Sequence, residues 1–329
     1  MGISPETIEQ LVLQTFPQAS VVTCRRLEGG VTNLNYALQL DNPTAEVALR
    51  VYQPDTPQDT LDKEIYVLRV TMPETGVPTP RIIHFDDSRT LVDRPYAVLN
   101  LLPGEPLEKV LPNMDELDQE AVGYEMGRYL AKLHSIPLEQ FGEFLGQDPL
   151  ASASEKAYTV ARLTEWLDTC QENDLLDEPA IAKLRRFVER TRALNRESAC
   201  FVHGDYHQGN ITVKEGVAGF HVTGVFDFEH AQGWSPEWDM ATLLSHVSDE
   251  HPALAKGFLD GYADTTGLPQ DLWERLRVYQ AVGSIALVVH AHRLGDAASL
   301  KTHQAKLYRF LEEDMQGWEE NEPPVTAVD

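Results

Sequence analysis

Between residues 34 and 40 every second side chain is apolar, and the positions between them are polar or small. This two-residue period is typical of a half-buried strand. A turn signal at residues 41–43 follows, and a second alternating run occupies residues 46–52. Two such runs across a short polar turn predict an antiparallel hairpin. In the second run the apolar positions 47, 49 and 51 share one face, which places Arg50 on the opposite face.

Farther along, apolar residues recur at helical spacing. Positions 61, 65, 68 and 72 are apolar, and this i, i+4, i+7, i+11 pattern defines one face of a helix. Pro73 and Pro78 predict its end. Two more runs, from Arg81 to Phe85 and from Arg94 to Leu101, have the composition of strands. The first hundred residues therefore predict an antiparallel sheet with one helix.

The pattern changes after the turn-forming residues 103–106. Asn113 and Glu116 have the spacing of a capping box and predict a helix that runs to about His134. Further helices are expected near residues 155–173, 179–195, 237–247, 252–264, 270–294 and 298–318, and a strand-rich segment is expected from 201 to 228. The predicted fold class is α+β, with two lobes: a sheet-rich part at 1–102 and a larger α-rich part at 103–329.

Composition adds a strong negative charge. The 329 residues include 52 acidic and 27 basic side chains, a formal charge of −25, so nucleic acid and membrane surfaces are not expected as partners. No apolar run reaches the roughly 18 residues of a membrane helix, and the first residues resemble no signal peptide. The cysteines Cys24, Cys170 and Cys200 have neither a disulfide framework nor a metal-binding spacing. A cytoplasmic protein is expected.

The strand-rich segment carries the clearest chemistry. Asp205 is followed five residues later by Asn210, and Asp227 comes 17 residues after that. Strand-like runs after Asn210 and before Asp227 predict a hairpin that brings these two side chains to one end. Mg²⁺ prefers such oxygen ligands, with phosphates and water completing its shell. Asp205 is then left to accept a proton from an attacking hydroxyl, which is the division of labour that phosphoryl transfer requires.

The motif His-Gly-Asp-x4-Asn at residues 203–210, with Asp-Phe-Glu at 227–229, resembles the aminoglycoside phosphotransferase and choline kinase family. These are small-molecule kinases with a protein-kinase-like fold, and the resemblance extends over roughly residues 27–244. It implies that Asp205 is the catalytic base and that Asn210 and Asp227 are the metal ligands. It further implies that His203 and Asp239 support the catalytic loop.

The resemblance also implies a nucleotide site. Residues 27–36 look like the family's nucleotide loop, and residues 99–103 look like its hinge, whose backbone meets the adenine. Arg50 stands where the family has a lysine or, in some members, an arginine, and Glu64 stands where it has a helix glutamate. The residues implied to bind ATP or GTP are Gly29, Gly30, Asn33, Asn35, Arg50, Glu64, Asn100 and Leu102.

Simpler interpretations exist for several of these residues. Paired glycines commonly form only a hairpin turn. Arg50 and Glu64 are also compatible with an ion pair that contributes little when exposed. Glu229 has two equally favoured interpretations: contact with a second metal ion or a cationic substrate, or an exposed charge on a loop. His207 is expected near phosphate or substrate, without a catalytic role.

Together these features predict a kinase with Mg²⁺ as cofactor and ATP or GTP as co-substrate. Its partners would be the nucleotide and a small hydroxylated molecule, an aminoglycoside-like amino sugar or an amino alcohol. The acidic chain favours a cationic acceptor only weakly, because acidic surfaces usually serve solubility. The alternatives are a homoserine- or choline-type metabolite kinase, a protein serine/threonine kinase, and a nucleotide-binding pseudokinase. No Ala-Pro-Glu-type activation segment follows Asp227, which favours small acceptors, and the complete acidic motif argues against a pseudokinase.

Overall fold

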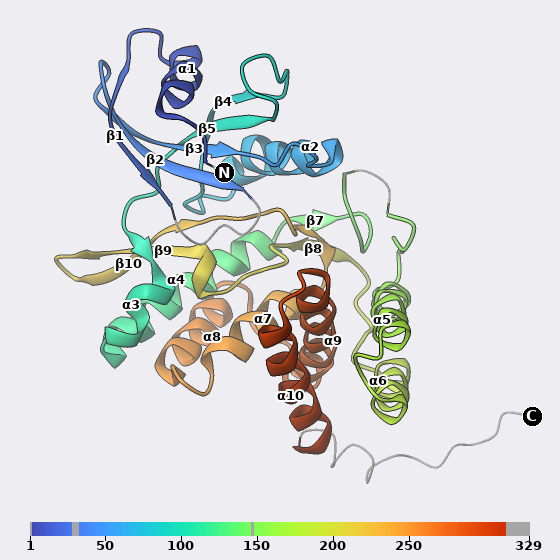
Figure 1. Cartoon of the computed structure of the whole chain (residues 1–329). Coiled ribbons are helices and arrows are strands. Elements are labelled where there is room, and N and C mark those ends of the chain that lie inside the picture. Colours follow the sequence, from blue (N-terminus) through green and yellow to red (C-terminus); the bar gives the residue numbers. More distant parts are fainter. Residues whose placement is uncertain (1, 28–32, 146–147, 314–329) are drawn as a thin grey trace, which may run out of the picture. The chain divides into compact units, whose positions relative to one another are not determined.

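The computed structural model describes residues 2–27, 33–145 and 148–313. Its N-terminal part consists of helix α1 (Pro5–Thr15), strands β1 (Ser20–Arg26), β2 (Leu34–Asp41) and β3 (Ala45–Val51), helix α2 (Gln58–Tyr66), and strands β4 (Ile82–Asp86) and β5 (Tyr96–Asn100). The five strands form one antiparallel sheet in the order β1-β2-β3-β5-β4 (Figure 1). The predicted hairpin and the two further strands are confirmed.

Strand β3 lies at the centre of this sheet. Its side chains at positions 47, 49 and 51 are at most 1% exposed and belong to an apolar core shared with β2, β5 and α1. Arg50 lies on the opposite face, as the alternation predicts, with Asn35 of β2 and Ala97 of β5 as its cross-strand partners. Pairing on both sides holds this register, because a slip of one residue would exchange the two faces.

Helix α1 has no counterpart among the predicted elements. Its first turn is capped by Ser4, whose hydroxyl accepts a hydrogen bond from the Thr7 amide at 3.2 Å, and Pro5 occupies the first helical position. Ile8, Leu11 and Val12 are buried against the sheet. The cap, the proline and this spacing are a helix signal in the sequence, but only three apolar side chains form the buried face, so the periodicity is weak.

Helix α2 confirms the predicted helix and shows how it ends. The α-helical turns stop at Tyr66 and continue as a π-helical turn (Val67–Thr71) and a 3₁₀ turn (Met72–Glu74). This change of helix type precedes Pro73, which has no amide to donate. The α-helical part buries Lys63 and Glu64 in addition to Leu61, so charged side chains are held within its packed face.

The rest of the described chain is mainly helical. Its helices are α3 (Leu107–Val110), α4 (Glu116–His134), α5 (Glu155–Glu172), α6 (Glu178–Arg190), α7 (Glu237–Val247), α8 (Pro252–Thr266), α9 (Leu272–Arg293) and α10 (Ala297–Glu313). Its strands are β6 (Glu105–Pro106), β7 (Pro137–Leu138), β8 (Ala199–Val202), β9 (Ile211–Gly216), β10 (Gly219–Val225) and β11 (Gln232–Trp234). The six helices predicted after residue 150 are present, and the α+β fold class is confirmed.

The predicted cap of α4 is wrong. Asn113 ends a 3₁₀ turn instead of starting the helix. The N-cap is Asp115, whose Oδ1 accepts a hydrogen bond from the Asp118 amide at 2.8 Å. Both residues are good caps by type, and the preceding turn through Pro112 decides between them because Met114 then adopts an extended conformation.

Contacts divide the chain into two compact units. The first comprises Met1–Leu133, His203–Ala231 and Val247–Gly267, and the second comprises His134–Val202, Gln232–His246 and Leu268–Asp329. The first unit contains the N-terminal sheet, helix α8 and a second sheet in the order β10-β9-β6. The expected boundary between lobes at residues 102 and 103 stays a prediction.

Helices α4 and α8 pack with their backbones in direct contact in the first unit. Each carries two glycines four residues apart, and a Cβ at any of the four would lie 2.0–2.2 Å from a carbonyl oxygen of the other helix. The glycines are Gly123, Gly127, Gly257 and Gly261. Because no larger residue fits at this distance, the glycines set how closely the helices approach.

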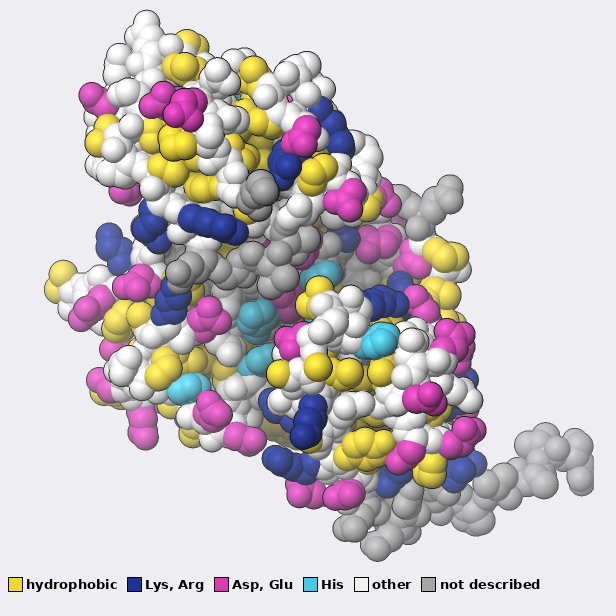
Figure 2. All heavy atoms as spheres, viewed as in Figure 1, with side chains coloured by type: hydrophobic (Ala, Val, Ile, Leu, Met, Phe, Trp, Pro, Cys, Tyr) yellow, Lys and Arg dark blue, Asp and Glu magenta, His cyan; other side chains and the backbone are white. Residues whose placement is uncertain are grey.

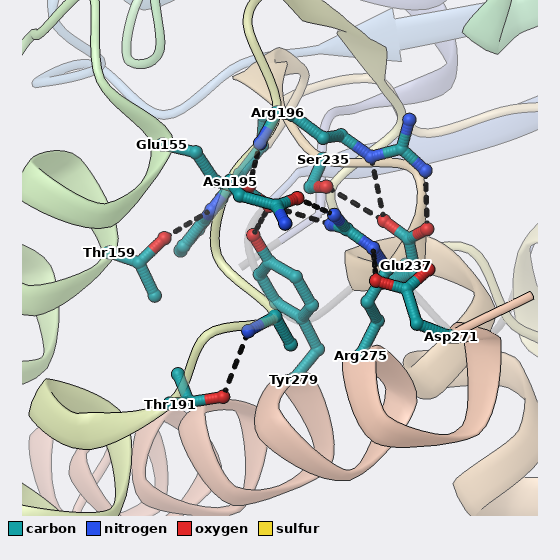
Figure 3. Close-up of polar contacts among 12 residues, drawn as sticks. Glu155, Thr159, Thr191, Asn195, Arg196, Ser235, Glu237, Asp271, Arg275 and Tyr279 are labelled. Carbon is teal, nitrogen blue, oxygen red and sulfur yellow. Dashed lines mark hydrogen bonds and ion pairs between the residues drawn. The ribbon is translucent and has the colours of Figure 1, made fainter. Parts of the chain in front are cut away.

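The second unit is held together by a buried polar network (Figure 3). Glu155 at the start of α5 is 1% exposed and accepts hydrogen bonds from Tyr279 and Arg275 of α9, at 2.9 and 3.4 Å. Glu237 accepts two hydrogen bonds from Arg196 and a third from Ser235. Charges this deeply buried are tolerated because each has partners, and removal of one partner would leave the other uncompensated.

No helix among the described residues is both long and apolar enough to cross a membrane.

Candidate active site

The loop from His203 to Asn210 follows strand β8 and closes with a 3₁₀ turn, Gln208–Asn210. Gly204 has φ +86°, and a Cβ there would lie 2.1 Å from the carbonyl oxygen of His230. Only glycine combines this conformation with so close an approach. The glycine of the motif thus brings the loop against the segment that follows Asp227.

Asp205 and Asn210 contact each other across this loop. The Asn210 Nδ2 group donates to the Asp205 carboxylate at 3.0 Å and to the Asp205 main-chain oxygen at 2.9 Å. Because both partners are acceptors, the amide orientation is determined and the Asn210 Oδ1 atom is directed away from them. The Asp205 side chain is 41% exposed, so it remains accessible to a substrate.

The predicted hairpin brings Asn210 and Asp227 to the same end. Strands β9 and β10 pair antiparallel with Ile211 opposite Val225, and the Phe226 amide donates to the Asn210 carbonyl oxygen at 3.1 Å. Asp227 follows with φ +69°, a backbone conformation that non-glycine residues rarely adopt. Such strain concentrates at functional sites because the surrounding structure must maintain it.

Arg50 joins the sheet to this hairpin within the first unit. Its guanidinium lies 3.0 Å from Glu64 of α2, 3.5 Å from Asp227 and 3.9 Å from Glu229. The guanidinium also lies over the ring of Tyr52, 5.4 Å from its centroid. The pair of Arg50 and Glu64 is therefore not the exposed ion pair of the simpler interpretation, because the two side chains are only 14% and 4% exposed.

The electrostatics of the site keep Arg50 and Asp205 charged. Burial lowers the pKa of the Arg50 guanidinium, but the charges of Glu64, Tyr52, Asp227 and Glu229 outweigh it and raise the pKa above its ordinary value. For the Asp205 carboxyl, burial by itself raises the pKa. The hydrogen bond from His207 and the nearby histidine charges outweigh burial and hold that pKa well below its usual range.

The structure describes only some of the residues that are expected to bind the nucleotide. Gly29 and Gly30 lie outside the described residues. Asn33 is 8% exposed, and its buried Oδ1 atom has no hydrogen-bond partner among the residues that the structure describes. Asn35 is half-buried on β2, opposite Arg50. An unpaired buried acceptor beside the expected nucleotide loop is a reason to expect a ligand there.

The hinge residues are placed at the end of β5. The Asn100 Oδ1 atom accepts a hydrogen bond from the Arg81 amide at 2.5 Å, so this side chain joins β5 to the start of β4. Leu102 is half-buried and packs beside Gly224 of β10, where a Cβ would lie 2.5 Å from the leucine. Contact of either residue with a nucleotide stays a prediction.

The two expected support residues lie in different units. His203 in the first unit contacts the Phe226 carbonyl oxygen through Nε2 at 2.9 Å and accepts a hydrogen bond from the Asp205 amide at 3.3 Å. It thus connects the segments that carry Asp205 and Asp227. Asp239 in the second unit is fully buried, with its Oδ2 atom 3.0 Å from His134 Nε2. Its expected support of the catalytic loop stays a prediction.

The sequence motif does not indicate the anchor of this loop. The Tyr206 hydroxyl donates to the Met126 carbonyl oxygen of α4 at 2.9 Å, and the tyrosine is fully buried. The loop is thereby attached to the helix whose glycines pack against α8. An aromatic residue directly after Asp205 was the available signal, but its partner is 80 residues away in the sequence.

The oxygen atoms at the end of the hairpin fit a Mg²⁺ ion, and a hydrogen-bond donor of Arg50 fits a nucleotide phosphate. Asn210 Oδ1 and the half-exposed Asp227 carboxylate lie at one end of the hairpin, and Mg²⁺ binds through one or two such oxygens plus phosphates and water. The Arg50 Nε atom is buried and has no hydrogen-bond partner among the described residues. A phosphate oxygen would satisfy this donor. No group of three or more His, Cys, Asp or Glu side chains in the described part is arranged to hold a metal ion.

The sheet with its buried arginine–glutamate pair and the loop and hairpin with Asp205, Asn210 and Asp227 define a phosphotransferase with a protein-kinase-like fold. The sequence carries the same assignment independently, since the profile of the phosphotransferase enzyme family matches residues 23–279. The chain belongs to this family. The resemblance that the motif implies is therefore confirmed.

Solved structures agree on the fold. Aminoglycoside phosphotransferase APH(4)-Ia aligns with a TM-score of 0.69 and 16% identity, over 94% of this chain and 99% of its own. The GDP complex of aminoglycoside 2'-phosphotransferase-IIIa aligns with a TM-score of 0.69 and 16% identity, over 95% and 100%. The gentamicin complex of APH(2")-IIa aligns with a TM-score of 0.64 and 15% identity, over 94% and 97%. Among curated protein sequences none gives a significant match.

Proposed function

We propose that this protein transfers the γ-phosphoryl group of ATP or GTP to a hydroxyl group of a small molecule, an amino sugar or an amino alcohol. The observation that carries the proposal is the meeting of Asp205, Asn210 and Asp227 at one end of a hairpin, next to Arg50 and Glu64. These are the parts that phosphoryl transfer needs: a positioned carboxylate, metal ligands and a phosphate clamp.

In this proposal Asp205 accepts the proton of the acceptor hydroxyl. The hydroxyl oxygen forms a bond to the γ-phosphorus, and the bond from that phosphorus to the β–γ bridging oxygen breaks, with its electron pair leaving on the nucleoside diphosphate. The ionised, accessible carboxylate of Asp205 suits this role. Arg50 binds the phosphates through Nε and is oriented by Glu64. Most of the rate then comes from positioning and charge neutralisation.

Asn210 and Asp227 would hold Mg²⁺. The charge of the ion they hold would offset the negative charge of the phosphates. Glu229 contacts Arg50 at 3.9 Å and His230 at 3.6 Å. It is 26% exposed, so it is not the free loop charge of the simpler interpretation, and a role toward a second metal ion or a cationic acceptor remains our proposal.

A small acceptor is favoured over a protein. Only nine residues lie between Asp227 and Glu237 at the start of α7, and this interval includes strand β11. It therefore leaves little chain for an activation segment that would position a peptide. The solved structures with this fold include complexes with gentamicin and with hygromycin B, which supports an amino sugar as the first acceptor to test.

The deciding experiment measures nucleoside diphosphate release from Mg·ATP and Mg·GTP with gentamicin, hygromycin B, kanamycin, choline and glucose as acceptors. We expect acceptor-dependent turnover with at least one amine, and loss of at least about 10²-fold in kcat for Asp205→Asn, which is typical of a lost general base. Nucleotide affinity should be nearly unchanged in this variant. A residual turnover above about a tenth of wild type, only about 1.4 kcal/mol, would contradict the role of Asp205.

A further inference from the structure

His207, two residues after Asp205, makes a polar contact at each of its ring nitrogens. Its Nδ1 atom accepts a hydrogen bond from the Gly209 amide at 3.0 Å and so caps the 3₁₀ turn Gln208–Asn210. Its Nε2 atom lies 3.3 Å from Asp205 Oδ2. The side chain is 25% exposed, so most of the ring is buried.

These contacts determine where the imidazole carries its proton. A backbone amide can only donate, so Nδ1 must be the unprotonated nitrogen of the neutral ring. The proton is then on Nε2, the nitrogen that faces the Asp205 carboxylate. The loop backbone thus makes His207 a donor toward Asp205, since the opposite tautomer would place a hydrogen against the Gly209 amide.

A second donor reaches the same oxygen. Asn210 Nδ2 donates to Asp205 Oδ2 at 3.0 Å and lies 3.4 Å from His207 Nε2. With its proton on Nε2, His207 cannot accept a hydrogen bond from Asn210 there, so both groups donate to the same carboxylate oxygen. Two donors restrict the orientation of a carboxylate more than one donor does. Among the described residues, the hydrogen bonds to this carboxylate converge on Oδ2, so Oδ1 is the oxygen available to an acceptor hydroxyl.

We propose that His207 is a positioning residue of the phosphoryl transfer, which orients the Asp205 carboxylate through the Nε2 hydrogen bond. The proposal rests on the proposed kinase function and assigns His207 a role that the sequence motif alone does not indicate. His207 touches neither nucleotide nor acceptor in this role. Its removal should therefore lower kcat and leave the KM for ATP nearly unchanged, since a misoriented base slows the chemical step alone.

Two substitutions distinguish the effect of the hydrogen bond from the effect of the bulk of the side chain. His207→Gln keeps an N–H donor near the position of Nε2, whereas His207→Leu removes the donor and retains bulk. We expect His207→Leu to reduce kcat about 10- to 100-fold and His207→Gln to retain at least about a third of wild-type kcat. His221→Leu, at an exposed position of β10, serves as the control and should leave kcat unchanged.

Affinity for Mg·ATP and the melting temperature are measured for each variant, so a loss of kcat is compared only among folded proteins. A kcat within twofold of wild type for His207→Leu would overturn the proposal. Equal losses in the Gln and Leu variants would overturn it as well, because a donor at that position would then be irrelevant. A rise in the KM for ATP as large as the fall in kcat would instead place His207 in nucleotide binding.

A spectroscopic readout tests the contact without turnover. Long-range ¹H–¹⁵N correlation spectra of the ¹⁵N-labelled full chain at pH 9 should show the His207 ring with its proton on Nε2, and Asp205→Asn should shift the Nε2 resonance. A ring protonated on Nδ1 would overturn the proposal. If wild-type protein phosphorylates none of the acceptors and does not hydrolyse ATP, the kinase proposal fails, whereas the nitrogen spectrum still decides whether His207 donates to Asp205.

Discussion

Arg50 is a cation that three carboxylates approach, yet one of its own donors is left unpaired. Glu64, Asp227 and Glu229 lie 3.0–3.9 Å from its terminal nitrogens, while Nε is buried with no hydrogen-bond partner in the described part of the chain. An arginine presents a planar fork and stays charged at any working pH, whereas a lysine at this position would act as a compact point charge. The unpaired donor is the observation on which the proposed phosphate contact of Arg50 rests.

Arg50→Ala should raise the KM for ATP and lower kcat, with kcat/KM falling about ten- to a hundredfold. The reason is that a hydrogen bond to a charged group contributes about 1.5–3 kcal/mol. Steady-state kinetics at varied ATP measure this change. Arg25→Ala, at an exposed position of β1, removes the same charge from the same sheet and should have no effect.

Glu64→Ala should give a smaller loss than Arg50→Ala. The double variant should lose less than the sum of the two, because both residues act through one phosphate contact. Losses below about twofold for Arg50→Ala in a folded protein would mean that another group holds the phosphates.

Asp227→Ala should weaken binding of Mg·ATP much more than binding of metal-free ATP. Its carboxylate lies at the open end of the β9–β10 hairpin, beside Asn210, where a divalent cation needs negative oxygen ligands. Metal-free ATP is repelled by the same carboxylate, so its affinity should not fall. Calorimetric titrations with and without Mg²⁺ measure the affinities for Mg·ATP and for metal-free ATP. Asp93→Ala serves as the control, because the side chain of Asp93 is 76% exposed. Equal losses would make Asp227 a structural carboxylate.

At the scale of elements, the contact between α4 and α8 supports the catalytic loop. Gly127 lies one residue after Met126, whose carbonyl oxygen holds Tyr206, and a Cβ at Gly127 would lie 2.0 Å from the Phe258 carbonyl oxygen. Backbone atoms cannot move aside as a flexible side chain can. The two helices would therefore have to separate to accept any larger residue.

Gly127→Ala should lower the free energy of unfolding by about 1–3 kcal/mol or more through this overpacking. Gly283→Ala in α9 is the matched control, because a Cβ there meets nothing within 4 Å. It should raise the free energy of unfolding by about 0.5–1 kcal/mol, since a helical glycine costs that much relative to alanine. Urea denaturation measures both, and effects of the same sign would contradict the backbone contact.

At the scale of the whole molecule, the net charge of −25 acts on ligands over distance. Figure 2 shows Asp and Glu side chains spread over the visible face rather than gathered in one patch. A charge so distributed attracts cations in general, at a range set by the Debye length of about 10 Å at 0.1 M salt. It serves solubility whether or not the acceptor is cationic.

If the acceptor carries positive charge, its kcat/KM should fall as NaCl rises from low ionic strength, by more than the change seen for ATP. Kinetics with an amine acceptor and with glucose, measured between about 10 and 300 mM NaCl, test this. A flat profile, or a neutral polyol that outperforms every amine, would show that the acidic surface does not select the acceptor.

The sequence by itself determined much of the fold and predicted which residues the structure brings together at the candidate site. Alternation put Arg50 opposite the apolar face of β3, because side chains of a strand point to opposite faces with a period of two. Helices after residue 150 started within two residues of their expected positions. The strand-like runs between Asn210 and Asp227 also predicted that these two residues lie together, since a hairpin joins segments that are close in sequence.

Only the tertiary structure decided the contacts between distant segments. The partners of Arg50 on the hairpin are 177 and more residues away, and Tyr206 and Met126 are 80 residues apart. The tautomer of His207 depends on the three-dimensional turn that places the Gly209 amide against its ring. Local periodicity records which face of an element is buried, but which groups meet across elements depends on packing. The contacts of His207 are local, yet hydrophobic periodicity does not record the turn geometry that places its Nδ1 atom against the Gly209 amide and its Nε2 atom against Asp205.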